Sequence, residues 1–291
     1  MSSLIINSHK FSFVVNRLRQ FFLSKKYVEV HTQNRLSILA ACEDPSTISI
    51  YNYAASHWPL PQTGQMWLEY ELLKDSKPPG YFCLSTSYRN EPDPIPGRHE
   101  IIFPMFEFEL KGDYLEMQKM ERELLIHLGY KANDRNLFPE GDYEYIAKKM
   151  NVNEITSKEE MSLYTKDKMP VFFLKNFPEY TSPFWNMKRY EEDKTKSKKI
   201  DIILSGMETI GSAERSCDKD DMRNRFNTIS GGKYAKLLYS LFGRERVDRE
   251  MDEFLSHNFI TRSGGGIGMT RLIRSMELEG LIPKEVVEAR S

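Results

Sequence analysis

The stretch GGGIGMTR, residues 264–271, places four glycines among the seven residues that precede Arg271. Glycine has no side chain, so a flat ligand can lie against its backbone, and Arg271 can meet a phosphate as a planar fork. Both common nucleotide-binding patterns fail, however. GxGxxG meets Met269 at its last position, and the phosphate-loop pattern GxxxxGK[ST] fails at Tyr234. By itself the stretch leaves a simple glycine turn and a phosphate site both open.

A second group of phosphate-directed residue types lies in and just after the proline-rich loop YRNEPDPIPGRHE, residues 88–100. Three cationic side chains on one strand–loop–strand unit suit a triphosphate, and an aromatic ring at the loop exit can stack on a purine. The residues in question are Arg89, Glu91, Arg98, His99 and Phe103. Taken alone, the same loop also fits a solvated surface hairpin.

Two carboxylates, Asp201 and Glu208, flank the segment IILSGM. Carboxylates at a strand end and just past its turn suit Mg²⁺ bridged to phosphates. A surface acid pair is the alternative interpretation. Arg215 follows on what we expect to be the adjacent strand.

The apolar pattern predicts an α+β fold, with helices packed around a mostly antiparallel sheet, because nothing in the chain alternates in the order of a doubly wound parallel sheet. An amphipathic helix capped by Ser8 opens the chain, and a second helix runs from its cap Asp113 to Gly129. Strands are expected at residues 27–30, 81–87, 103–110, 171–174 and 199–206, and a last strand leads into the glycines.

Alternation within residues 103–110 separates two faces of that strand. One face carries Phe106, Phe108 and Leu110, and the other carries Phe103, Met105, Glu107 and Glu109. Residues 131–170 are polar and mixed, which we interpret as a peripheral helical insertion. The charge run KRYEEDKTKSKK, residues 188–199, is interpreted as a solvated hairpin tip.

Composition limits the classes to which this protein can belong. The chain has 41 basic and 42 acidic residues, so no overall basic field attracts nucleic acid. The scattered cysteines Cys42, Cys83 and Cys217 form neither a CxxC pair nor a metal-binding spacing, which favours reduced thiols. The N-terminus shows no signal-peptide pattern and no apolar run approaches membrane-spanning length, so we expect a soluble cytoplasmic protein with a single domain over residues 1–291.

These segments occur in the order of the three motifs of a class II aminoacyl-tRNA synthetase catalytic core, which the chain resembles over roughly residues 10–280. FSFVVNRLRQFFLSKKYVEVHT resembles the first motif, with Gln33 where the family often has proline. YRNEPDPIPGRHEIIFPMFEFE resembles the second motif and GGGIGMTR the third. TGQMWLE, PFWNMK and DIILSGMETIGSAER are most similar to the aspartyl and asparaginyl enzymes.

The resemblance implies a role for each matching residue. In catalysis, Arg89 would hold the ATP α-phosphate, Arg271 the γ-phosphate, and Glu208 would take part with them. Adenosine and phosphates would be bound by Arg89, Glu91, Arg98, His99, Phe103, Gly266, Gly268 and Arg271. Mg²⁺ would be held by Asp201 and Glu208, and the amino acid would lie beside Gln65, Leu68 and Arg215.

Some positions depart from the family. Leu68 stands where aspartate-using members generally place a lysine, for which Lys188 is a candidate substitute, and Ala213 stands where the family often has a metal-linked serine. The first motif begins almost at Met1, which leaves no room for the subgroup's N-terminal anticodon-binding domain and favours a stand-alone enzyme.

We therefore predict an AMP-forming ligase that makes asparagine from aspartate, ammonia and ATP through an aspartyl-adenylate. Two alternatives stay open. The protein either activates asparagine or a related amino acid for transfer to tRNA or another acceptor, or serves as a non-catalytic amino-acid or nucleotide sensor. The first-motif helix forms a two-fold interface in the family, so the resemblance also implies a homodimer.

Overall fold

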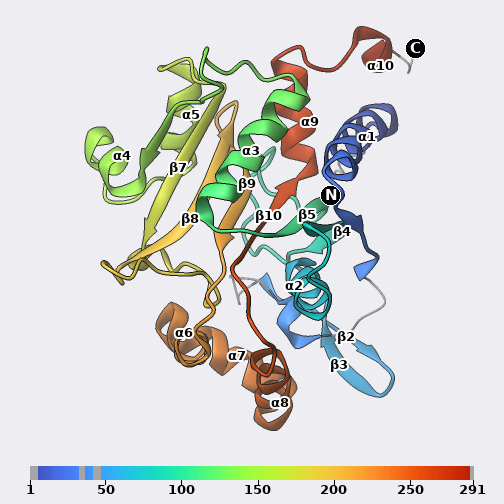
Figure 1. Ribbon diagram of the computed structural model, residues 1–291, viewed down its shortest axis with the longest axis vertical. Helices are drawn as coiled ribbons and strands as arrows, with labels where there is room; N and C mark the ends of the chain where they lie inside the picture. The colour runs from blue at the N-terminus through green and yellow to red at the C-terminus, as the bar shows by residue number, and fades with distance from the viewer. Residues whose placement is uncertain (1–5, 33–36, 42–46, 289–291) are drawn as a thin grey trace.

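A mixed, mostly antiparallel sheet forms the centre of the protein in the computed structural model, which describes residues 6–32, 37–41 and 47–288. Eight strands lie in the order β1-β4-β5-β10-β9-β8-β7-β6 (Figure 1), and only β1–β4 and β6–β7 pair in parallel. In that order they are Val28–Glu29, Gly80–Tyr88, Ile102–Lys111, Arg262–Gly268, Met207–Glu214, Lys196–Leu204, Val171–Pro178 and Glu140–Asp142. The predicted α+β fold is confirmed.

Helices cover this sheet in separate groups. Helices α1 (Ser8–Ser24), α3 (Tyr114–Leu128) and α9 (Met269–Leu278) gather on one side with α10 (Lys284–Glu288) (Figure 1). A second group comprises α6 (Lys219–Thr228), α7 (Lys233–Phe242) and α8 (Arg244–Leu255), and the 3₁₀ turn Ile229–Gly232 joins α6 to α7. The remaining elements are α2 (Gln65–Lys74), α4 (Tyr143–Met150), α5 (Ser157–Thr165), the hairpin β2–β3 (Ile50–Tyr53, Ser56–Pro59) and the 3₁₀ turns Ile38–Ala40 and Glu179–Thr181.

Side chains on the central strands alternate between two faces, as the pleat of a sheet requires. One row of paired residues points toward α1, α3 and α9: Ile200, Ser212, Gly265 and Phe108. The next row points the other way: Asp201, Gly211, Gly266 and Glu107. The predicted two-faced pattern of β5 follows this alternation, because Phe106, Phe108 and Leu110 are buried in the main apolar core. One face of the sheet is therefore apolar and the other is charged.

Local capping agrees with the sequence at α3 and differs at α1. Asp113 forms a capping box with Glu116, and Gly129 ends the helix in the left-handed conformation with φ 108°. At α1 the predicted cap Ser8 is wrong by one residue. Asn7 is the cap, because its side-chain oxygen accepts from the backbone N–H groups of the two residues that follow Ser8.

The charge run at residues 188–199 forms the predicted hairpin, closed by the Arg189–Ser197 bridge and exposed at residues 191, 192, 194 and 195, but the ends of the run are not solvated. Arg189 is only 4% exposed, and its guanidinium donates to the carbonyls of Phe184 and Met187 and pairs with Glu179 at 2.6 Å. The end of the run forms the first part of β8. The charged sequence alone does not show which of these side chains are buried, because the register of β8 decides which lysines face the inside of the protein.

Two of the three cysteines lie in the described part of the chain, Cys83 buried and Cys217 exposed, both as free thiols. Cys42 lies outside the described residues, as does Gln33. Among the helices described, none has the length and apolar character needed to cross a membrane.

One acidic side chain, Glu121 of α3, lies inside the apolar layer between helix and sheet. It is fully buried, and neither of its oxygens has a hydrogen bond of ordinary geometry among the described residues. Burial raises the pKa of its carboxyl from 4.5 to about 8, against smaller opposing effects of Ser212 and Arg122. The folded chain thus holds a proton that the unfolded chain releases above about pH 4.5.

The substitution Glu121→Gln should remove a loss of stability that accumulates as the pH rises from about 5 to 8. A carboxyl whose pKa is raised by folding stabilises the fold fully below its unfolded pKa, and this contribution is lost as the pH rises toward 8. We expect the native protein to lose roughly 1 kcal/mol of unfolding free energy per pH unit from this group between about pH 5 and 8. Urea unfolding of both proteins at several pH values measures this, with Glu123→Gln on the exposed side of α3 as control. Parallel pH profiles for Glu121→Gln and native protein would contradict the argument.

Candidate active site

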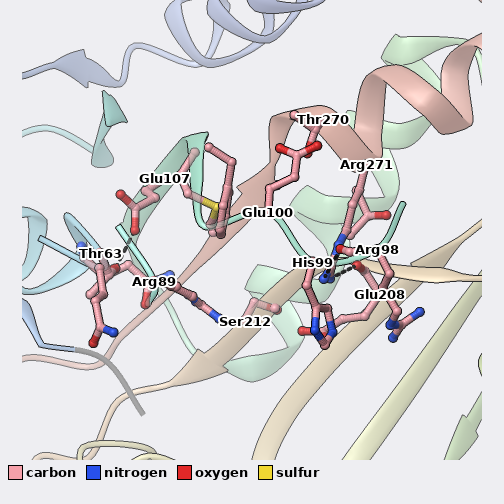
Figure 2. Close-up of a pocket in the computed structure, with 18 of the residues that line it drawn as sticks. Thr63, Arg89, Arg98, His99, Glu100, Glu107, Glu208, Ser212, Thr270 and Arg271 are labelled. Atoms are coloured by element: carbon pink, nitrogen blue, oxygen red, sulfur yellow. Dashed lines mark hydrogen bonds between the residues drawn. The ribbon is translucent and has the colours of Figure 1, made fainter. Parts of the chain in front are cut away.

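A cavity of about 330 Å³ opens on the charged face of the sheet (Figure 2). Most of the residues predicted for the site line it: Gln65, Arg89, Glu91, Arg98, His99, Phe103, Glu208, Arg215, Gly266, Gly268 and Arg271. The residues come from α2, from the β4–β5 hairpin, from β9, and from the β10–α9 junction. Segments far apart in the sequence therefore meet over one patch of sheet.

Glycines form the floor of this cavity. A Cβ on Gly266 would lie 2.7 Å from Met105 Cε and 3.3 Å from Gln65 Nε2, and so would fill space above β10. A Cβ on Gly264 would overlap the Glu109 carboxylate and come within 2.6 Å of the Phe108 carbonyl oxygen. The first glycine leaves room for a ligand, and the second leaves room for a side chain of the protein itself.

Cations gather at the end of the cavity beside the β4–β5 hairpin, where Figure 2 shows Arg98, His99, Arg271 and Glu208 close together. Arg271 donates from Nη1 to the Glu208 carbonyl at 2.7 Å and from Nη2 to the Arg98 carbonyl at 3.3 Å. It thereby joins the hairpin loop to β9. The Arg89 guanidinium lies 5.7 Å from the centre of the Phe103 ring. This end has the charge needed for a polyphosphate and an aromatic ring beside it.

Burial lowers the pKa of His99, and the cations of Arg271, Arg98 and Arg89 lower it further against the opposing effect of Glu91. His99 is therefore a neutral imidazole at pH 7. It contributes a hydrogen-bonding group to the cavity rather than a further positive charge.

The two predicted metal ligands converge on Gly211. A Cβ there would lie 3.3 Å from Glu208 Oε1 and 3.5 Å from Asp201 Oδ1, so the missing side chain leaves a space that both carboxylates border. Glu208 lines the cavity and Asp201 lies behind it, 7% exposed. Burial opposes ionisation of Glu208, but Lys199, Arg271, Arg89 and Arg98 outweigh it and lower the pKa.

This pair of carboxylates fits a divalent cation. Hard oxygen donors are what Mg²⁺ prefers, and it commonly takes one or two protein carboxylates and completes its shell with water and phosphate. No cluster of three or more acidic, histidine or cysteine ligands occurs in the described chain. Asp201 and Glu208 would therefore hold the ion only together with a bound polyphosphate.

Glu160 is a site residue that the sequence did not predict. It belongs to α5, inside the segment interpreted as peripheral, yet its Oε2 accepts from Arg98 Nη2 at 2.7 Å and from the Glu208 backbone N–H at 3.0 Å. Burial and the nearby Glu208 raise its pKa, against Arg98. Residues 131–170 thus reach the site. Their polar composition concealed this, because one buried acid in a surface helix leaves no periodic signal.

Buried charges also surround the other end of the cavity. Arg215 pairs with Glu109 at 2.7 Å, and its Nη2 donates to Gln65 Oε1 at 3.2 Å. Glu69 lies 3.9 Å from Arg215 and pairs with the fully buried Arg262 at 2.6 Å. Burial raises the pKa of Glu109 to about 7, with Arg215 opposing the rise. Two arginines and two carboxylates therefore balance one another behind Gln65.

Leu68 does not line the cavity, so its predicted place beside the amino acid is wrong. It is fully buried in an apolar cluster with Leu72, Tyr81 and Cys83. The reason is helical geometry, because α2 turns Gln65 toward the cavity and Glu69, one turn later, toward the buried arginines. Leu68 faces β4 instead. Lys188, the candidate substitute cation, pairs with Glu214 at 2.8 Å and does not line the cavity.

Together the antiparallel sheet, the glycine floor and the arginine-lined hairpin define the catalytic core of a class II synthetase. The family model described as tRNA synthetases class II (D, K and N) matches residues 5–282, and the chain belongs to this family. No curated protein matches the chain significantly.

Solved structures share this fold. Asparaginyl-tRNA synthetase from Pyrococcus horikoshii, complexed with asparaginyl-adenylate, superposes with a TM-score of 0.73 at 20% identity over 91% of this chain and 64% of that one. The Entamoeba histolytica asparaginyl enzyme with asparaginyl-adenylate gives 0.71 at 17% over 96% and 65%. The aspartyl enzyme of the same organism gives 0.66 at 17% over 91% and 54%. The chain thus spans less than two thirds of these proteins.

Alanine at Gly264, which does not line the cavity, and at Gly266, which does, should separate an effect on folding from an effect on binding. Gly264→Ala places a methyl group on the Glu109 carboxylate and beside backbone, and we expect it to cost about 2 kcal/mol of stability or more. Gly266→Ala meets only the ends of two flexible side chains, so stability should change by less than about 1 kcal/mol while ATP binding weakens. Urea unfolding and calorimetry with ATP measure the two effects. Equal losses of stability would contradict the distinction.

Proposed function

We propose that this protein is an AMP-forming ligase that couples ATP to activation of an amino-acid carboxylate. The observation that carries the proposal is one cavity with two different ends. Arg98 and Arg271 stand at one end with Glu208, and Arg215 and Gln65 contact each other at the other end. Arg89 lies nearer Thr63 and Glu107 (Figure 2). A nucleoside triphosphate bound at the first end and an amino acid bound at the second would meet above the glycines of β10.

The chemistry needs charge compensation more than a nucleophile. A carboxylate attacks the α-phosphorus of ATP in line, the acyl–phosphate bond forms, and pyrophosphate leaves. Both reactants are anions, so fixed cations lower the barrier by offsetting their repulsion. Arg89 and Arg271 would serve in this way. A bound Mg²⁺ would supply further positive charge on the phosphates.

The charge balance behind Gln65 bears on the substrate. Arg215 contacts Glu109 and Arg262 contacts Glu69, so each arginine already has a carboxyl partner within the protein, and this end favours a group with no net charge. Aspartate that enters with its β-carboxylate toward the phosphates presents an ammonium and an α-carboxylate here, and these two charges cancel. In the reverse orientation it presents a lone carboxylate. We therefore infer activation of the β-carboxylate of aspartate, followed by attack of ammonia on the β-aspartyl-adenylate to give asparagine and AMP.

The same balance also fits a neutral side-chain amide. Asparagine activated at its α-carboxylate is therefore the second candidate reaction, with tRNA or another molecule as the acceptor. Two solved asparaginyl-tRNA synthetases of similar fold are complexed with asparaginyl-adenylate. The two candidates differ in which carboxylate becomes activated, and that difference is measurable.

Trapping with hydroxylamine should identify the activated carboxylate. With ATP and aspartate we expect β-aspartyl hydroxamate, pyrophosphate and AMP, and with ammonia in place of hydroxylamine we expect asparagine. Mass spectrometry and NMR distinguish the α from the β product. Arg89→Ala should lower AMP formation by about a hundredfold or more, since it removes a charge that stabilises the transition state.

The other outcomes are equally informative. The α-hydroxamate of asparagine, formed from asparagine and ATP, would replace the first candidate by the second. If neither aspartate nor asparagine supports AMP formation, both candidate reactions are overturned. Native protein that binds ATP without pyrophosphate exchange for any amino acid would point to a sensor.

We also propose a homodimer. Strand β1 forms an outer edge of the described sheet. Val28 within it is 40% exposed, and Leu23 near the end of α1 is 54% exposed. The face of α1 that holds Val14 and Leu18 is already buried within the chain. An exposed edge with apolar side chains favours pairing with a second copy.

Light scattering should therefore give twice the 34.1 kDa chain mass. The double substitution Leu23→Glu, Val28→Glu should shift the protein toward monomer at micromolar concentration, while Tyr145→Glu at an exposed site of α4 should not. A monomer mass that is independent of concentration would refute the dimer.

A further inference from the structure

The end of the charge run at residues 188–199 puts a lysine into the site. Lys199 lies on β8 directly opposite Ala213 of β9, on the face that carries Asp201. Its side chain is 16% exposed and lines the cavity together with Glu208 and Gly211. The small residues on β9 leave space for a long side chain to lie across the strand.

Two contacts fix the Lys199 ammonium. Nζ lies 3.0 Å from Asp201 Oδ2 and 4.2 Å from the centre of the Phe177 ring. An aromatic face and a carboxylate both favour a cation at this point. The lysine therefore occupies the neighbourhood of the two carboxylates that fit a divalent ion.

The net charge around Lys199 becomes more negative when a polyphosphate binds. Asp201 and Glu208 border the same space, and Glu160 accepts from the Glu208 backbone N–H. Lys199 pairs with Asp201, and Arg98 pairs with Glu160. A polyphosphate adds several negative charges to that set. A flexible ammonium can turn from a carboxylate to a phosphate oxygen at little cost, because it is a compact charge on four rotatable carbons.

We propose that Lys199 is a phosphate ligand, a built-in cation that pairs with Asp201 in the ligand-free site and with the nucleotide's phosphates when ATP binds. This inference rests on the proposed use of ATP. It has two consequences of opposite sign. Lys199 strengthens binding of polyphosphate, and it competes with a divalent ion for Asp201 in the absence of nucleotide.

The substitution Lys199→Met tests both consequences on the full chain by binding measurements. Titration calorimetry with pyrophosphate in EDTA should show affinity weaker by about tenfold or more, the usual effect of losing one charge-assisted contact. Binding of Mn²⁺ alone, followed by its electron paramagnetic resonance signal, should become severalfold tighter because the competing ammonium is gone. A purely structural Lys199–Asp201 pair predicts an unchanged pyrophosphate affinity, and that result would overturn the proposal, as would unchanged or weaker Mn²⁺ binding.

Three further variants keep the test decisive. Lys196→Met removes a charge from an exposed position on β8 and should leave both affinities unchanged. Lys199→Arg retains the charge and should keep pyrophosphate affinity within about threefold of native. If thermal unfolding shows that Lys199→Met does not fold, Lys199→Gln takes its place with the same expectations. Native protein that binds neither ATP nor pyrophosphate would refute the proposed function itself, a result distinct from equal binding by native and variant.

Discussion

The alternation of side chains across β8, β9, β10 and β5 is the constraint on which the rest of this protein depends. One row of the sheet packs into the apolar layer under α1, α3 and α9, and the next row faces the cavity. A shift of one residue in any of these strands would exchange the two sets, so register and function are fixed together. Glycine occupies much of the charged face because Glu107, Glu109, Asp201 and Glu208 all need space above it.

Charge pairing sets the second requirement. Glu69, Glu109, Arg215 and Arg262 are almost completely buried, and a buried charge is tolerated only when partners satisfy it. At the end beside the β4–β5 hairpin the charges are mixed, since Arg98, Arg271 and Lys199 stand among the acidic Glu208, Asp201 and Glu160. Cations that can turn from these acids to a ligand suit a polyanion, and the ion-paired arginines at the other end suit a substrate of zero net charge. The two ends of the cavity thus differ in kind as well as in place.

The sheet also explains why a single helix can serve both structure and recognition. Helix α2 buries Leu68 and Leu72 against β4, while Gln65 faces the cavity and Glu69 meets the arginines behind it. The N-terminus of α2 is held by Glu107, which accepts from Thr63 at 2.5 Å and from the Gly64 N–H at 2.7 Å. A carboxylate of β5 therefore positions the residue that would contact the amino acid.

The sequence by itself determined the α+β class, most strands, the capped helix α3 and the family, because these rest on local periodicity and on motifs that keep their order along the chain. It also predicted most of the cavity residues, since GGGIGMTR and the hairpin loop carry their chemistry in short contiguous segments. Only the tertiary structure decided that Leu68 faces the core, that Glu160 reaches Arg98, and that Lys199 turns toward Asp201. Each of these depends on strand register or on packing between distant segments, and a side chain's type and spacing contain no information about which distant segment will lie against it.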